Sequence, residues 1–381
     1  MNEVSLSSLI LSILLFIFSL TLTYQSIFKK RKTWFFNLAV YLSFLLTLSE
    51  VVRSAVTGKD LSLILITIAL IIWSLIYILL FLFFQQLVSN TINPILTIVI
   101  FLFYFIEIEF GILQFFDYPG IINYLYILLW DLGYDSLGFI IFIYGAIVHF
   151  RILKRSKNIE AGIITSALIV IAFGFVWGFT IDFFIFLENI GVLVSSNFLS
   201  IIKKSLLSGD IIKALGILVF TGVYVFRPNY IFKHPFKIDS LIIYNRIGLP
   251  IYGAKYTKSN TEEEKEITEK KSYHFELIGG AINALSEFII TTAGSKKKLN
   301  EINTEDKIIK IVSTDLCSIV VMSDKISFFL IQSMKRVVNL ITKKYPKELE
   351  EKHLEDDIFP DIKKMIKDSF PFLPKPVYEY S

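Results

Sequence analysis

Two glutamates interrupt a long apolar run, in the sequence FYFIEIEF that covers residues 103 to 110. An ionised side chain costs at least about 2.5 kcal/mol inside a membrane, and such residues usually face a bundle interior or a water-filled cavity. Because Glu107 and Glu109 lie about 200° apart around a helix, they cannot both point inward. Carboxylates in this setting could bind a proton, a cation or an amine.

Other ionisable residues are expected near the same depth. Asp131 and Asp135 are four residues apart, which places both on one helix face. A rise of about 1.5 Å per residue from a start at Ile95 puts the two glutamates in the outer half of the membrane. The sequence therefore predicts an outward-facing polar pocket. Its candidate residues are Glu107, Glu109, Asp131, Asp135, Asp182, Asp210, Arg53 and Lys213.

Two hypotheses remain open for these residues. In the first, the carboxylates outnumber the nearby cations Arg53 and Lys213, so that some are protonated, hydrated or waiting for a cationic ligand. In the second, they lie at the water interface, pair with one another and only fix the packing of the helices. Neither hypothesis involves a metal site, because none of the four histidines shares the level of the carboxylates. His149 is expected at the cytoplasmic interface.

The composition indicates a membrane protein. Hydrophobic residues make up 54% of the chain, 36 residues are Phe, and the mean hydropathy is +0.62. A helix needs about 20 mostly apolar residues to cross a bilayer, and we predict seven such spans. They run from Leu6 to Phe28, Trp34 to Val56, Leu61 to Leu87, Ile95 to Phe116, Ile127 to Phe150, Ala161 to Leu187 and Leu206 to Phe226.

The distribution of basic residues predicts the orientation, because cytoplasmic loops are enriched in Lys and Arg. With the N-terminus outside, eleven Lys and Arg residues fall in inner loops and five on the outer side. We therefore expect a multi-pass protein of the cell membrane with a cytoplasmic C-terminus. Gly174 and Gly178, spaced as GxxxG, are predicted to permit close helix packing.

The chain changes character after a short basic linker at residues 231–237. The region from residue 238 to the end holds 22 basic and 22 acidic residues and no apolar run long enough to span. Its single cysteine, Cys317, excludes a disulfide framework and is expected in the core. Three basic residues near the linker are expected to be drawn to anionic lipid by about 1 kcal/mol each. They are Arg227, Lys233 and Lys237.

Alternating and helical patterns in this region predict the element order β-β-α-β-β-β-α-α. The charged stretch 259–272 is expected to be a solvated loop or exposed helix turn, with no role in binding nucleic acid or metal. The tail at 370–380 is expected to be extended, either packed on the domain, disordered or serving as a short partner motif. The predicted elements are strands at 240–245, 251–257, 298–303, 307–313 and 317–323, and helices at 275–290, at 326–345 and from about residue 360.

This order, together with "LIIYNRIGLPIYG" and "ELIGGAINALSEFI", resembles the longin and roadblock group of small domains over residues 238–345. The matching positions are Gly248, in the first hairpin, and the patch Gly279-Gly280-Ala281 in the first helix. The extra first helix of the roadblock branch is missing, so longin-like is the closer description. The resemblance implies an antiparallel five-stranded sheet sandwiched by helices. It also implies binding, without catalysis, to small GTPases or to a second copy of the fold.

Several chemistries have no support in the residues. The chain has no phosphate-binding loop, dinucleotide fingerprint, nucleophile elbow or HExxH motif, so we expect no enzyme activity and no cofactor. Lys213 lies near the outer end of its span, which argues against a retinal protein. A transporter coupled to protons or cations is the main alternative, although inverted repeats with broken helices are not visible.

These patterns together predict a receptor-like membrane sensor or anchor. It has a seven-helix bundle at 1–230, a longin-like domain at 238–345 and a C-terminal helix and tail at 346–381. The partners expected from the resemblance are a small GTPase or a longin or roadblock protein, including a homodimer through the cytosolic domain. A passive scaffold is the remaining alternative.

Overall fold

The structure is a computed structural model of the chain. It describes residues 3–28, 33–55, 59–89, 91–113, 121–156, 159–192, 196–227, 236–256, 271–293, 299–351, 358–370, 373 and 375–380. The chain divides into two compact units. The first comprises Met1–Gln86 and Thr91–Tyr230, and the second comprises Leu87–Asn90 and Ile231–Ser381.

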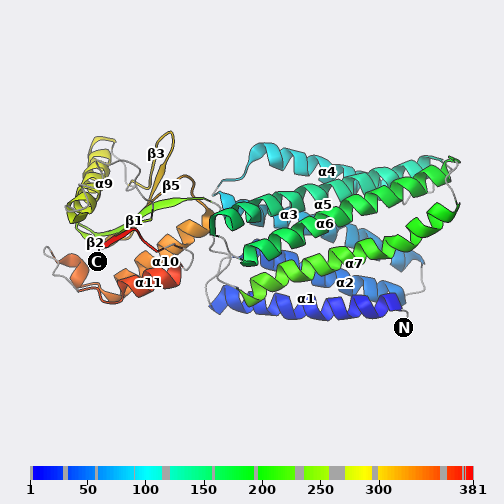
Figure 1. Cartoon of the computed structure of the whole chain (residues 1–381), viewed down its shortest axis with the longest axis horizontal. Helices are drawn as coiled ribbons and strands as arrows, with labels where there is room; N and C mark the ends of the chain where they lie inside the picture. The colour runs from blue at the N-terminus through cyan, green and yellow to red at the C-terminus, as the bar shows by residue number, and fades with distance from the viewer. Residues whose placement is uncertain are drawn as a thin grey trace. The chain divides into compact units, whose positions relative to one another are not determined.

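The first unit is a bundle of long helices that run side by side (Figure 1). Helix α5 packs against α4 and α6, α6 also packs against α7, and α1 contacts both α2 and α7. These helices are α1 (Glu3–Phe28), α2 (Trp34–Ala55), α3 (Lys59–Val88), α4 (Pro94–Leu113), α5 (Ile121–Ser156), α6 (Ile159–Asn189) and α7 (Ser196–Phe226).

Five of these helices are long and apolar enough to cross a membrane, which makes the chain a multi-pass membrane protein. Among the described residues, α2 and α7 contribute shorter apolar stretches, at Trp34–Ser49 and Ile211–Phe226, so seven spans remain a prediction. The five stretches are Leu9–Ile27, Ile71–Val88, Pro94–Leu113, Ile122–Lys154 and Ile159–Asn189.

The second unit is an antiparallel sheet with helices on both faces (Figure 1). The strand order is β3-β4-β5-β1-β2-β6, so the first strand lies in the middle of the sheet. Its elements are β1 (Ile238–Asn245), β2 (Pro250–Lys255), α9 (Lys271–Ala293), β3 (Glu301–Asn303), β4 (Ile308–Ser313), β5 (Cys317–Ser323), α10 (Phe328–Lys344), a 3-10 turn at Glu348–Glu350, α11 (Ile362–Ser369) and β6 (Tyr378–Tyr380).

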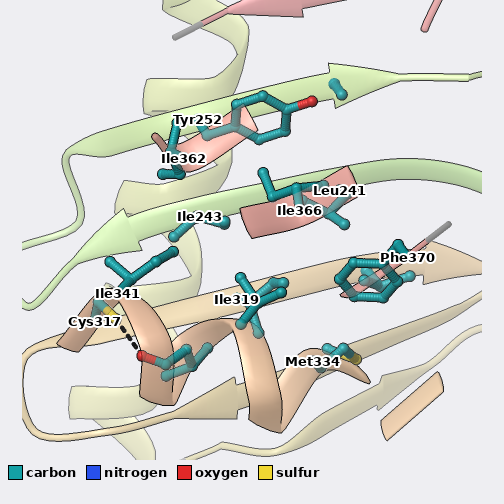
Figure 2. Packing of buried hydrophobic residues seen from close by; sticks show 14 of the residues in the cluster. Leu241, Ile243, Tyr252, Cys317, Ile319, Met334, Ile341, Ile362, Ile366 and Phe370 are labelled. Atoms are coloured by element: carbon teal, nitrogen blue, oxygen red, sulfur yellow. Dashed lines mark hydrogen bonds between the residues drawn. The ribbon is translucent and has the colours of Figure 1, made fainter. Parts of the chain in front are cut away.

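The central strand β1 is buried on both faces, which explains its nearly continuous apolar sequence. Leu241 and Ile243 belong to the larger core cluster, with residues of α10 and α11 (Figure 2). Ile242 and Tyr244 belong to the smaller cluster, with residues of α9. Successive side chains of a strand point to opposite faces, so β1 supplies both cores.

The sheet corrects the expected strand number. The prediction of five strands is wrong, because Tyr378–Tyr380 adds a sixth strand that pairs antiparallel with β2. The tail therefore packs on the domain, and Tyr378 stacks on Phe275 of α9 with ring centroids 5.8 Å apart. Three residues are too short a run for periodicity to reveal a strand. Most of the charged stretch 259–272 lies outside the described residues, and α9 begins at Lys271.

The two glycine positions of the longin resemblance meet in space. Gly248, in the turn between β1 and β2, has a φ of +92° that favours glycine. A Cβ at Gly279 of α9 would lie 2.6 Å from the Gly248 carbonyl oxygen, so the helix backbone packs directly on the turn. Asn245 supports this turn, since its side-chain oxygen accepts hydrogen bonds from the backbone N–H groups of Ile247 and Leu249.

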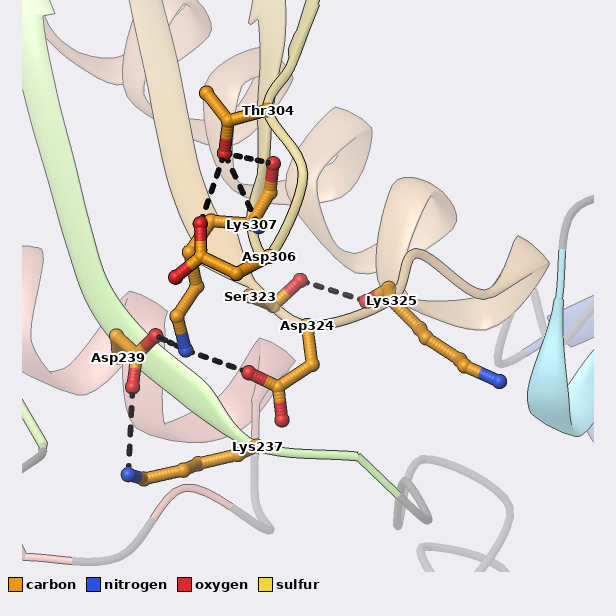
Figure 3. A network of polar contacts seen from close by, with 8 residues as sticks. All are labelled: Lys237, Asp239, Thr304, Asp306, Lys307, Ser323, Asp324 and Lys325. Carbon is orange, nitrogen blue, oxygen red and sulfur yellow. Dashed lines mark hydrogen bonds and ion pairs between the residues drawn. The ribbon is translucent and has the colours of Figure 1, made fainter.

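A lysine ties three strands together at one end of the sheet (Figure 3). The Lys307 Nζ lies 2.6 Å from a carboxylate oxygen of Asp239 and 2.6 Å from one of Asp324. The two carboxylates raise the pKa of the Lys307 ammonium above its usual value. Lys237, at the end of the linker, extends the network, because its Nζ lies 3.8 Å from Asp239.

Replacing this lysine gives a test of the domain in the full chain. Lys307→Met leaves Asp239 and Asp324 without their shared cation, and we expect a loss of about 1 kcal/mol, the upper end for an exposed network. Cys317 reports the change, because it is buried and burial raises the pKa of its thiol. Its labelling rate should therefore follow transient opening and rise about fivefold.

The matched control is Lys325→Met, which removes an exposed lysine beside the same network. It should leave the labelling rate of Cys317 unchanged. Equal rates for the two variants would show that the network does not stabilise the domain.

Candidate functional site: a charged cluster inside the helix bundle

Glu107 lies where two helices touch backbone to backbone. A Cβ at Gly133 of α5 would be 2.8 Å from the Glu107 nitrogen and 3.0 Å from its Cα, so only glycine permits this approach. Gly133 falls between Asp131 and Asp135 in the sequence. The contact therefore brings the carboxylates of α4 and α5 to one level of the bundle.

A second glycine makes room for an acid and a base. A Cβ at Gly178 of α6 would lie 3.7 Å from both carboxylate oxygens of Asp135 and 3.9 Å from the Lys213 Nζ. The predicted role of Gly178 in close helix packing is therefore incomplete, because this position borders charged side chains from α5 and α7. Lys213 is also held by ring faces, with its Nζ 5.1 Å from the Phe175 centroid and 6.0 Å from that of Tyr134.

Four charged residues form one electrostatic group across α5, α6 and α7. Asp131 is within interaction range of the carboxylates of Asp182 and Asp135 and of the ammonium of Lys213. Asp131 and Asp135 are buried, whereas Asp182 and Lys213 are half-buried. One cation among three carboxylates leaves the group with surplus negative charge unless protons or other cations neutralise it.

Glu107 stands apart from this group. It is 1% exposed, and neither of its carboxylate oxygens has a hydrogen-bond partner. The Ser74 hydroxyl of α3 is the polar side chain that acts on the Glu107 carboxyl group. Tyr77, also on α3, is close enough to interact electrostatically with Glu107. We define Glu107, Asp131, Asp135, Asp182 and Lys213 as the intramembrane cluster.

Of the three remaining predicted residues, the structure describes the side chain of one. Glu109 is exposed, in keeping with its position about 200° around α4 from Glu107. Arg53 and Asp210 belong to α2 and α7, but the structure does not describe their side chains. Within the described residues no group of three His, Cys, Asp or Glu side chains could hold a metal ion.

The basic residues near the linker have partners of their own. Arg227 Nε lies 3.9 Å from a carboxylate oxygen of Glu160, and Lys237 pairs with Asp239. Lys233 lies outside the described residues. Arg227 and Lys237 are both exposed, and each has a carboxylate partner. Their attraction to anionic lipid stays a prediction.

His149 is fully buried among the helices of the bundle. Its expected place at the cytoplasmic interface stays a prediction. Its Nδ1 lies 2.7 Å from the Gly145 carbonyl oxygen and its Nε2 lies 2.6 Å from the Tyr224 hydroxyl. The Gly145 carbonyl can only accept, so Nδ1–H donates to it and Nε2 accepts from Tyr224. Only tertiary contacts link residues 75 positions apart, so no sequence signal pointed to this pair.

The second unit carries a different candidate surface on α9. Phe275, Gly279, Ile282 and Ser286 form the buried face of the helix. The opposite face exposes three large apolar side chains, Leu277 at 54%, Leu285 at 46% and Phe288 at 64%, with Ala281 and Ala284 between them. We call this set the α9 stripe. An apolar patch of this kind marks an interaction site more often than an ordinary surface.

The two glycines of the bundle give opposite expectations for the same substitution. Gly133→Ala forces α4 and α5 apart and should cost about 1–3 kcal/mol, as overpacking does. Gly178→Ala meets only ordinary van der Waals contacts and should be neutral or slightly stabilising, since alanine favours helix. Thermal unfolding of the full chain in detergent, followed by circular dichroism, measures both; equal losses would contradict the direct contact at Gly133.

No family model, curated protein or solved structure matches the chain. The case for a function therefore rests on the intramembrane cluster and the α9 stripe.

Proposed function

We propose that the protein is a receptor-like sensor of the cell membrane. In this proposal the intramembrane cluster receives the signal, and the C-terminal domain recruits a cytosolic protein. The observation that carries the proposal is the α9 stripe, in which three exposed large apolar side chains lie together on one helix face. The proposal assigns no reaction to the chain.

The α9 stripe has the character of a protein-binding surface. Leu277, Leu285 and Phe288 recur at helical spacing on one face, and the small residues between them allow another backbone to approach. Burial of apolar area contributes about 25 cal/mol per Å², and a few large anchors usually carry most of the binding energy. The stripe could therefore supply the central anchors of an interface.

The resemblance to longin domains supplies the class of partner. The contact between Gly248 and Gly279, and helices on both faces of an antiparallel sheet, are compatible with that group. The partner proposed on this basis is a small GTPase or another longin or roadblock domain, a second copy of the chain included.

The connection between the units suits a sensor. Helix α7 ends at Phe226 and β1 begins at Ile238, so eleven residues separate them. Such a segment spans at most about 40 Å when fully extended, which keeps the domain near the membrane. Because α7 also carries Lys213, a change at the intramembrane cluster has a covalent route to the domain.

An ion-coupled transporter is the second candidate, and the intramembrane cluster favours it. Carboxylates and a lysine on facing helices suit proton or cation coupling. Solute uptake into vesicles that contain the purified chain, lost in Asp135→Asn, would favour this alternative over the sensor.

Recruitment can be tested with the full chain in lipid nanodiscs. The probes are purified small GTPases of the source cell, loaded with GDP or with a non-hydrolysable GTP analogue. Selective binding of one GTPase is expected, and Leu285→Glu with Phe288→Glu should weaken it at least tenfold, because both changes place a charge in the proposed interface.

The control is Leu340→Glu, which adds the same charge at a half-exposed leucine of α10. This variant should bind like the original chain. Self-association that is lost in the double variant would identify a second copy as the partner. Absence of both interactions would contradict recruitment through the α9 stripe.

The cytoplasmic position of the domain is tested separately. In sealed cells that produce the chain, a protease added to the medium should leave the region from residue 238 to 381 intact. The same protease should digest it after the membrane is opened. Digestion in sealed cells would place the domain outside and overturn the orientation.

A further inference from the structure

We propose that Glu107 is a proton-binding site whose occupancy is coupled to the contact between α4 and α5. This inference rests on the sensing role proposed for the bundle and names its input as a proton. Neither a metal ion nor an amine is needed as the ligand of this residue.

The first argument is the isolation of the Glu107 carboxyl group. The side chain is 1% exposed, both oxygens lack a hydrogen-bond partner, and no cation among the described residues pairs with it. An unpaired carboxylate buried in a low-dielectric interior costs so much that it takes up a proton instead. In this packing Glu107 therefore carries a proton.

The second argument is the packing around it. The backbone of Glu107 lies directly on Gly133, and the side chain has Ser74 and Tyr77 of α3 as neighbours. A proton is the one ligand that needs no added volume in such a contact. The described residues also contain no set of three ligating side chains for a metal ion.

The third argument is that the available ammonium group serves other carboxylates. Lys213 lies beside Asp135 at Gly178, over the rings of Phe175 and Tyr134, and acts electrostatically on Asp131. Lys213 therefore occupies the site between the aromatic rings and Asp135, where an ammonium ligand could otherwise bind. Among the described residues Glu107 has no cation to neutralise it, and a proton can do so.

Deprotonation of Glu107 would place a negative charge near other titratable side chains of the bundle. Tyr77 of α3 interacts with Glu107, and also with Tyr134 and Asp135 of α5. Beyond Asp135, Asp131 interacts with Asp182 and Lys213. Breaking the O–H bond releases one proton and leaves one negative charge on Glu107, a buried group that no described cation pairs with. That charge requires water or a cation, and we infer that water reaches it when α4 moves away from Gly133, where the two backbones are in direct contact.

Infrared spectroscopy of the full chain in lipid vesicles tests the protonation. At neutral pH the spectrum should contain a carbonyl stretching band of a buried carboxylic acid, and Glu107→Gln should lose that component. Glutamine keeps the size of the side chain and the neutral state, so the variant should fold. Glu109→Gln, two residues along the same helix, should retain the band.

Distance measurement tests the coupling. Spin labels at Ile112 of α4 and Leu125 of α5, both exposed, should move apart when the pH is raised, and Glu107→Gln should abolish that shift while Glu109→Gln preserves it. The inference is overturned if Glu107→Gln removes no component of the acid band, or if that variant keeps the pH-dependent shift. Neither readout involves a protein partner, so failure here is distinct from failure of recruitment through the α9 stripe.

Discussion

The cost of an unpaired charge in hydrocarbon constrains most of the bundle. Each carboxylate of the intramembrane cluster must be neutralised, and the chain does so in two ways. Asp131 and Asp135 lie within range of the ammonium of Lys213, whereas Glu107 has Ser74 and Tyr77 as neighbours and, in the proposal above, is neutralised by a proton. Gly133 and Gly178 are the positions at which helix backbones and charged groups come close enough for this arrangement. The backbone contact requires glycine at Gly133, whereas Gly178 borders the charged groups without a steric need for glycine.

In the C-terminal domain the unusual feature is an apolar surface that is left exposed to solvent. One face of its sheet is closed by α10 and α11, which share a continuous core with β1, β2 and β5. The other face is closed mainly by α9, whose small buried cluster leaves a second apolar face of the same helix exposed. Large apolar side chains grouped on the surface usually mark an interaction site. The proposed partner would complete this burial.

Helix α7 connects these two features along the chain. It carries Lys213 in the cluster, and near its end Tyr224 donates a hydrogen bond to His149 of α5 while the Val225 carbonyl accepts one from Gln25 of α1. Two other helices thus hold the last turn of α7 before the linker. A sensor of the proposed kind would need α7 to have more than one position, and these hydrogen bonds are the contacts that would have to change.

The sequence by itself determined the membrane class of the protein, the change to a charged second region, and the order of five strands and three helices. It also determined that Glu107 and Glu109 face different directions, since helical period is a local property. Tertiary structure alone decided which carboxylates share Lys213, that Glu107 is left without a partner, that His149 is buried, and that Tyr378–Tyr380 forms a sixth strand. These outcomes depend on distances between helices and strands far apart in the chain, and spacing along one element carries no information about such distances.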